Sequence, residues 1–106
     1  MGNICAMSSF AALAEPNRRL ILDALRPAPM TVSALVEAVG LSQPSVSKHL
    51  RVLRDAHLVN VRPRGQQRWY EVDPAPLMEM SDWLEPYRHM WAQRLDRLED
   101  HLDAQE

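Results

Sequence analysis

The chain has 106 residues and a formal net charge of −2, and 46% of its residues are hydrophobic. This length suits one domain, so we expect residues 1–106 to form a single unit. No apolar run approaches the roughly 20 residues that a membrane-spanning helix needs. One cysteine, Cys5, excludes an internal disulfide framework. The N-terminus is also unlike a signal peptide. Together, the single cysteine and this N-terminus predict a cytoplasmic protein without membrane association.

The small net charge hides an uneven distribution along the chain. Residues 16–70 carry nine Lys and Arg against three acidic residues, whereas residues 71–106 carry three Arg against ten acidic residues. Six of the cations fall within 48–68, where Asp55 is the only acid. A polyanion would bind such a concentration of positive charge, so the middle of the chain is a candidate nucleic-acid surface.

Two helices are predicted before residue 30. Residues 4–14, ICAMSSFAALA, are rich in alanine and apolar side chains. The pair Glu15-Pro16 predicts the start of a second helix, because proline is favoured at the first helical position. The RPAP stretch at 26–29 ends this helix. We expect it to bury Leu20, Ile21, Leu22 and Leu25.

Two further helices are separated by only a few residues. Thr31 is a predicted N-cap for a short third helix, and Gly40 is suited to its C-terminal end. Ser42 can cap a fourth helix over about 43–56. Two helices joined by a tight turn that contains glycine form a helix-turn-helix.

The fourth helix has two different sides. Val46, Leu50 and Leu53 recur at helical spacing and should face the core. The opposite side carries Lys48 and Arg51 between short polar residues, and it is basic rather than mixed in sign. Such a helix can dock through one side and present the other to phosphates and base edges.

Residues 58–73 predict a β-hairpin. Val59 and Val61, and again Trp69 and Glu71, follow the period of two that is typical of strands. The RPRGQQ segment between them supplies a proline and a glycine for the turn. The predicted tip and return are polar and basic, with Arg62, Arg64, Gln67 and Arg68.

The last helix is predicted over about 75–103. Its apolar residues step by three or four positions, and Pro86 should kink or split it near 84–86. So long an apolar stripe in a small protein predicts a homodimer. The stripe contains Leu84, Tyr87, Trp91, Leu95, Leu98 and Leu102.

Four helices, a basic hairpin and a last helix make a mainly α, α+β winged helix-turn-helix. In this order, and in the stretches LAEPNRRLILDAL, TVSALVEAVGLSQPSVSKHLRVLRDAHLV and VRPRGQQRWYEVD, the sequence resembles the ArsR family of dimeric bacterial repressors. The end, MWAQRLDRLEDHL, resembles a subgroup without a metal site. The resemblance implies a DNA-binding core at about 15–73 and dimerisation helices at about 4–14, with Phe10, and 75–103.

The resemblance also implies how DNA is bound. The fourth helix would enter the major groove of a palindromic operator, and the hairpin would lie along the backbone or minor groove. The first turns of the fourth helix would read bases. His49 belongs to the family pattern, but its position beside the apolar stripe predicts a structural role. The predicted DNA-binding residues are Gln43, Ser45, Ser47, Lys48, Arg51, Arg62, Arg64, Gln67 and Arg68.

The sequence departs from the family pattern after the fourth helix. His57 stands where many members have glycine. A left-handed C-cap conformation suits glycine and is strained for other residues, so the turn before the hairpin could differ. Glu15 replaces the usual aspartate before the proline, which should weaken that cap slightly.

Several alternatives remain open from the sequence. The span 31–35 holds no thiolate for a metal sensor, although His89, Asp100, His101 and Asp103 lie on the last helix. Redox sensing would depend on Cys5 alone. Met78, Met80 and Met90 with nearby aromatic residues could line a pocket for a small-molecule inducer. A winged helix that binds another protein is a further alternative. We expect no cofactor and, since no catalytic constellation appears, no enzyme.

Overall fold

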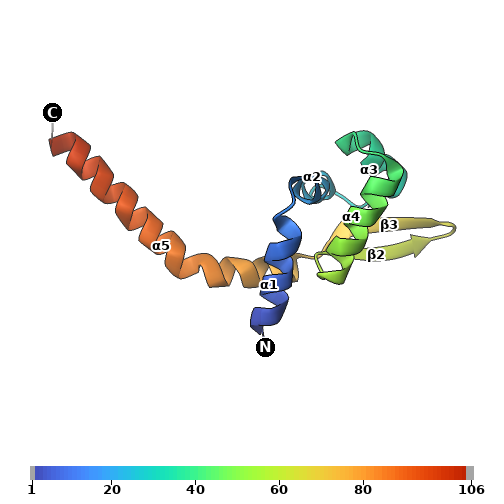
Figure 1. Cartoon of the computed structure of the whole chain (residues 1–106), viewed down its shortest axis with the longest axis horizontal. Coiled ribbons are helices and arrows are strands. Elements are labelled where there is room, and N and C mark those ends of the chain that lie inside the picture. The colour runs from blue at the N-terminus through green and yellow to red at the C-terminus, as the bar shows by residue number, and fades with distance from the viewer. Residues whose placement is uncertain (1, 105–106) are drawn as a thin grey trace.

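The computed structural model describes the backbone of residues 2–104 and the side chains of residues 8–100. The described residues form five helices and three strands; the first four helices and the strands lie together as a winged core at one end of the molecule, and the last helix extends away from it (Figure 1). Cys5 and Leu102 were singled out in the sequence, but their side chains lie outside the described residues. The elements are α1 (Gly2–Leu13), α2 (Pro16–Leu25), β1 (Met30–Thr31), α3 (Val32–Val39), α4 (Gln43–Asp55), β2 (Val59–Arg64), β3 (Gln67–Val72) and α5 (Pro74–Ala104).

The predicted helix starts are confirmed by their caps. The Glu15 carboxylate accepts a hydrogen bond from the backbone N–H of Arg18 at 3.0 Å. The hydroxyl of Thr31 caps α3 through the N–H of Ala34, and that of Ser42 caps α4 through the N–H of Ser45. Each cap satisfies a donor that the first helical turn leaves without an intrahelical partner.

The sheet has one strand more than the sequence predicted. β1 pairs antiparallel with β3, which places Met30 opposite Tyr70 and Thr31 opposite Trp69. The strand order is β1-β3-β2, so β3 is central. A strand of two residues is too short to show a period of two, and its pairing with β3 is what defines it.

The core lies between the helix-turn-helix and the base of the hairpin. Its members come from α1, α2, α3, α4, the turn after α4 and the start of β2. The completely or almost completely buried ones are Ile21, Leu25, Leu35, Val46, Leu50, Leu53, Leu58 and Val59. Leu20 was predicted to join them, but it is about half exposed. The buried side of α2 is therefore narrower than the sequence indicated.

The connection from α4 to the hairpin keeps a left-handed cap despite the missing glycine. His57 has φ 62°, in the left-handed region. Its N–H donates to the carbonyl of Arg54, and the N–H of Leu58 donates to the carbonyl of Leu53, both at 2.9 Å. These two bonds form a Schellman motif, in which two otherwise unpaired carbonyls are satisfied. The turn that His57 placed in doubt is thus retained.

Pro86 bends α5 without splitting it. The helix is continuous from Pro74 to Ala104, with Pro86 inside it. Figure 1 shows its first turns beside α1 and a long arm that leads away at an angle. Proline has no N–H for the carbonyl four residues earlier, which explains the bend. Across the bend, Nη2 of Arg88 donates to the carbonyl and the hydroxyl of Ser81 at 2.8 and 2.6 Å.

Candidate nucleic-acid interface

The outer side of α4 is polar and basic along its length. Val46, Leu50 and Leu53 anchor the opposite side in the core. The amide and cations predicted to meet DNA are therefore held on a helix whose rotation is fixed by packing. Of the predicted residues on α4, Gln43, Ser47, Lys48 and Arg51 are exposed, and Ser45 is half-buried.

Arg54 belongs to the same exposed side and was not predicted. It lies three residues after Arg51 and seven after Ser47, which places all three on one helical face. Its side chain is exposed in the last turn, where a cation is favoured by the helix dipole. The spacing from Arg51 was the signal in the sequence that would have identified it.

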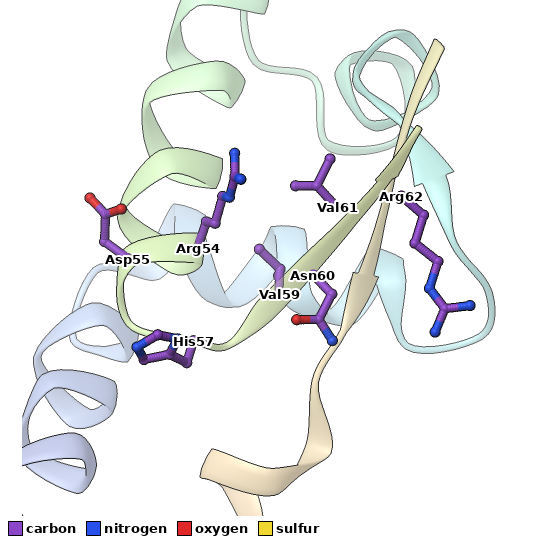
Figure 2. Close-up of a pocket in the computed structure, with 7 residues that line it drawn as sticks. All are labelled: Arg54, Asp55, His57, Val59, Asn60, Val61 and Arg62. Atoms are coloured by element: carbon purple, nitrogen blue, oxygen red, sulfur yellow. The ribbon is translucent and has the colours of Figure 1, made fainter. Parts of the chain in front are cut away.

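A depression separates the end of α4 from the hairpin. It is lined by Arg54, Asp55, His57, Val59, Asn60, Val61 and Arg62. In Figure 2, Arg54 extends toward the same side of β2 as Val61, whereas Arg62 leaves the strand on the opposite side. The two arginines at this edge therefore do not converge on one point.

The hairpin register divides the predicted basic residues between two faces. β2 and β3 pair so that Arg62 is opposite Trp69, Arg64 opposite Gln67, and Pro63 opposite Arg68. Directly opposed residues share a face, and neighbours along a strand alternate. We call the hairpin of β2 and β3 the wing. Arg62, Arg64 and Gln67 therefore lie together on one of its faces. Arg68 lies on the other, with Val61 and Tyr70.

The two arginines on the first face have different partners. Nε of Arg62 lies 2.8 Å from a carboxylate oxygen of Glu71. The guanidinium of Arg64 lies 5.3 Å from the ring centroid of Trp69, within cation–π range. The indole N–H of Trp69 is buried and has no hydrogen-bond partner. Trp69 thus contributes a packing surface for Arg64 rather than a polar contact.

His49 points inward from α4, which agrees with the structural role expected from its position beside the apolar stripe. Its side chain is mostly covered, and Nδ1 lies 3.8 Å from the carboxylate of Glu15. At that distance the pair is not hydrogen-bonded, and Nδ1 has no other partner. His49 thus lies between α4 and the start of α2 rather than on the outer basic side.

A second surface of interest is the apolar side of α5. Leu84, Tyr87, Trp91, Leu95 and Leu98 are all exposed, and we call these five residues the α5 stripe. Beside the stripe, Phe10 meets Trp83 edge-to-face with centroids 5.6 Å apart, and Trp83 lies 4.9 Å from Tyr87. The predicted interface residue of α1 is therefore in contact with the helix that carries the rest.

The three methionines considered for a ligand pocket do not share a surface. Met80 is buried, whereas Met78 and Met90 are exposed. Among the described residues, no group of three or more His, Cys, Asp or Glu side chains is placed to hold a metal ion. No helix in the described part of the chain is long and apolar enough to span a membrane.

Known proteins share both this sequence pattern and this fold. The profile of bacterial regulatory proteins of the arsR family matches residues 15–61. The HTH-type transcriptional regulator Rv2034 of Mycobacterium tuberculosis is 34% identical over 97 residues, which cover 92% of this chain and 88% of that protein. The chain belongs to the ArsR family.

Two further comparisons support the same assignment. The transcriptional repressor SdpR of Bacillus subtilis is 33% identical over 75 residues, which cover 71% of this chain and 83% of that protein. An ArsR-like transcriptional regulator from Rhodococcus sp. RHA1 superimposes with a TM-score of 0.74 at 28% identity, over 92% of both chains. The predicted family and winged helix-turn-helix fold are confirmed. The chain is a DNA-binding transcriptional regulator.

Proposed function

We propose that this ArsR-family protein is a homodimeric repressor of a palindromic operator. Each protomer inserts the outer side of α4 into the major groove and lays the wing, β2 and β3, along the backbone or in the minor groove. The first turns of α4 read base edges through Gln43, Ser45, Ser47 and Lys48. Arg51, Arg64 and Arg68 contact phosphates, and Arg62 lies on the same wing face as Arg64 but is paired with Glu71.

The observation that carries this proposal is the basic outer side of α4. Lys48, Arg51 and Arg54 are exposed on one helix, while its other side is fixed in the core. Among the described residues of α4, Asp55 is the only acid. A surface that binds another protein has no general need for one sign of charge, whereas a surface that binds the phosphate backbone must be positive.

The homodimer is supported by the α5 stripe. It runs along a helix arm that extends away from the core of its own protomer (Figure 1). Burial of two aromatic and three leucine side chains against a second copy would remove a large apolar surface from water. Two-fold pairing would also present both α4 helices to one duplex, as a palindrome requires.

The proposal can be tested by selecting bound sequences from a random duplex pool. We expect an imperfect palindrome with half-sites about one helical turn apart. If each protomer neutralises three or four phosphates, the slope of log K against log salt should lie near −5 to −7. Weak binding without sequence preference, by a chain that stays monomeric, would instead favour a module that binds another protein.

Lys48 provides a single-residue test of the groove assignment. Lys48→Ala should weaken operator binding roughly tenfold, because one contact per half-site is lost. Arg97→Ala removes the same charge from the exposed side of the α5 arm and should leave affinity within about twofold. Titration of a labelled operator at fixed salt measures both variants. Equal effects of the two changes would contradict the placement of α4 in the groove.

A further inference from the structure

Two arginines lie on the same face of the wing, but their charges are balanced differently. Arg62 and Arg64 are separated by one residue of β2 and share a face with Trp69 and Glu71. Arg62 contacts a carboxylate, whereas Arg64 lies over a neutral indole ring. The charge of Arg62 is therefore offset within the wing, and that of Arg64 is not.

The contact between Arg62 and Glu71 is set by the register of the hairpin. Glu71 is opposite Asn60, so Arg62 reaches it along the diagonal of the same face. The side chain of Glu71 is only 24% exposed, whereas that of Arg62 is 71% exposed. The carboxylate is thus held by its surroundings in the central strand, and the arginine approaches it from solvent. A phosphate that competes for Arg62 would have to approach this fixed negative charge.

We infer that Glu71 restrains Arg62 and thereby limits the sequence-independent part of DNA binding, an inference that rests on the proposed function. A pair of opposite charges contributes no net charge to the face that approaches the backbone. Counterion release depends on the number of phosphates that the protein neutralises. The wing therefore acts through Arg64 on this face, and Glu71 sets how strongly any duplex is held.

The consequence for DNA binding is quantitative. Neutralising Glu71 would free one cation per protomer, or two in the dimer. Each adds about −0.9 to the slope of log K against log salt, so the slope should become steeper by about 1.8. The ratio of variant to wild-type affinity should accordingly rise about 3.5-fold when the salt concentration is halved. The gain should be the same on operator and random duplex, because phosphates carry no sequence information.

The experiment compares wild type, Glu71→Gln, Arg62→Gln and the double variant on operator and random duplexes across a salt series. We expect Glu71→Gln to bind both duplexes more tightly with the steeper slope. Arg62→Gln alone should change the slope by less than about 0.5, and the double variant should return to the wild-type slope. Glu79→Gln, at an exposed position in α5, removes the same charge away from the wing and should leave the slope unchanged.

Three results would overturn the inference. The slope of Glu71→Gln could equal that of wild type. It could become shallower, which would mean that Glu71 orients Arg62 onto the backbone instead. The steeper slope could also persist in the double variant, which would show that Arg62 is not the cation released. In each case wild type still binds its operator, whereas failure of the proposed function would remove operator binding by wild type itself.

Discussion

Leu53 in α4 and Leu98 in α5 are both leucines on an apolar side of a helix, but they differ in how far they are buried. Leu53 is completely buried in the winged core, whereas Leu98 is 55% exposed on the arm of α5. The contrast extends to the apolar residues on the same side of each helix, since Val46 and Leu50 are buried with Leu53 whereas the arm beyond Pro86 is exposed throughout residues 87–100. The core completes its packing within one chain, and the arm does not.

This difference shows that apolar periodicity alone does not say where a side chain is buried. The stripes of α4 and α5 both repeat every three or four residues. Only the first has α2, α3 and β2 packed against it. The second is a surface that stays in contact with water unless another chain covers it. Stability should therefore respond to the core, and self-association to the arm.

The sharpest test of this contrast is the same substitution at both leucines. Leu53→Ala should lower the free energy of unfolding by about 3 kcal/mol, because it opens a cavity in a fully packed region. Leu98→Ala should cost less than about 0.5 kcal/mol when the chain is dilute enough to be monomeric. Urea denaturation of both variants gives the comparison. Similar costs at the two sites would mean that the arm is packed in the monomer.

The next largest effect is expected at the centre of the α5 stripe. Trp91→Ala should weaken self-association by about 2 kcal/mol, or roughly thirtyfold in the dimer dissociation constant, because buried tryptophans dominate interfaces. Sedimentation equilibrium measures this constant directly. Met78→Ala is the matched control, since Met78 is also apolar and 65% exposed but lies on a different side of α5. If Met78 proved as important as Trp91, the dimer surface would not be the stripe.

Much of the core could be predicted because its signals are local. The caps at Glu15, Thr31 and Ser42 depend on residues within three positions of each other, and all three form as predicted. β1 could not be predicted, because two residues form a strand only through their partner in β3. The exposure of Leu20 likewise depends on which neighbours reach α2 in three dimensions.

The candidate site was predicted less completely, and the reason is hairpin register. The sequence indicates a turn within RPRGQQ but does not say which two residues form its loop. The structure places Gly65, with φ 61°, and Gln66 there. A shift of one residue would move side chains to the other face. This register places Arg68 and Arg64 on different faces of the wing. It also brings Arg62 within reach of Glu71.

The smallest effect concerns a strained residue that links α4 to the wing. His57→Gly should raise the free energy of unfolding by about 0.5–1 kcal/mol, because glycine adopts the left-handed conformation without a steric cost. For a domain of this size, that corresponds to a few degrees in Tm. Thermal unfolding should be followed at one fixed protein concentration, since dimerisation also raises Tm.

His57→Ala separates backbone strain from side-chain loss. Alanine removes the exposed imidazole but keeps Cβ, so it should give no gain over wild type. The Schellman bonds from residues 57 and 58 use backbone atoms only, and both variants can keep them. If alanine stabilised the protein as much as glycine, the cost would lie in the imidazole, and the φ of 62° would not be a source of strain. The core would then contain less stored strain than its geometry indicates. Its larger contribution to the free energy of unfolding, compared with that of the arm, would come from packing alone.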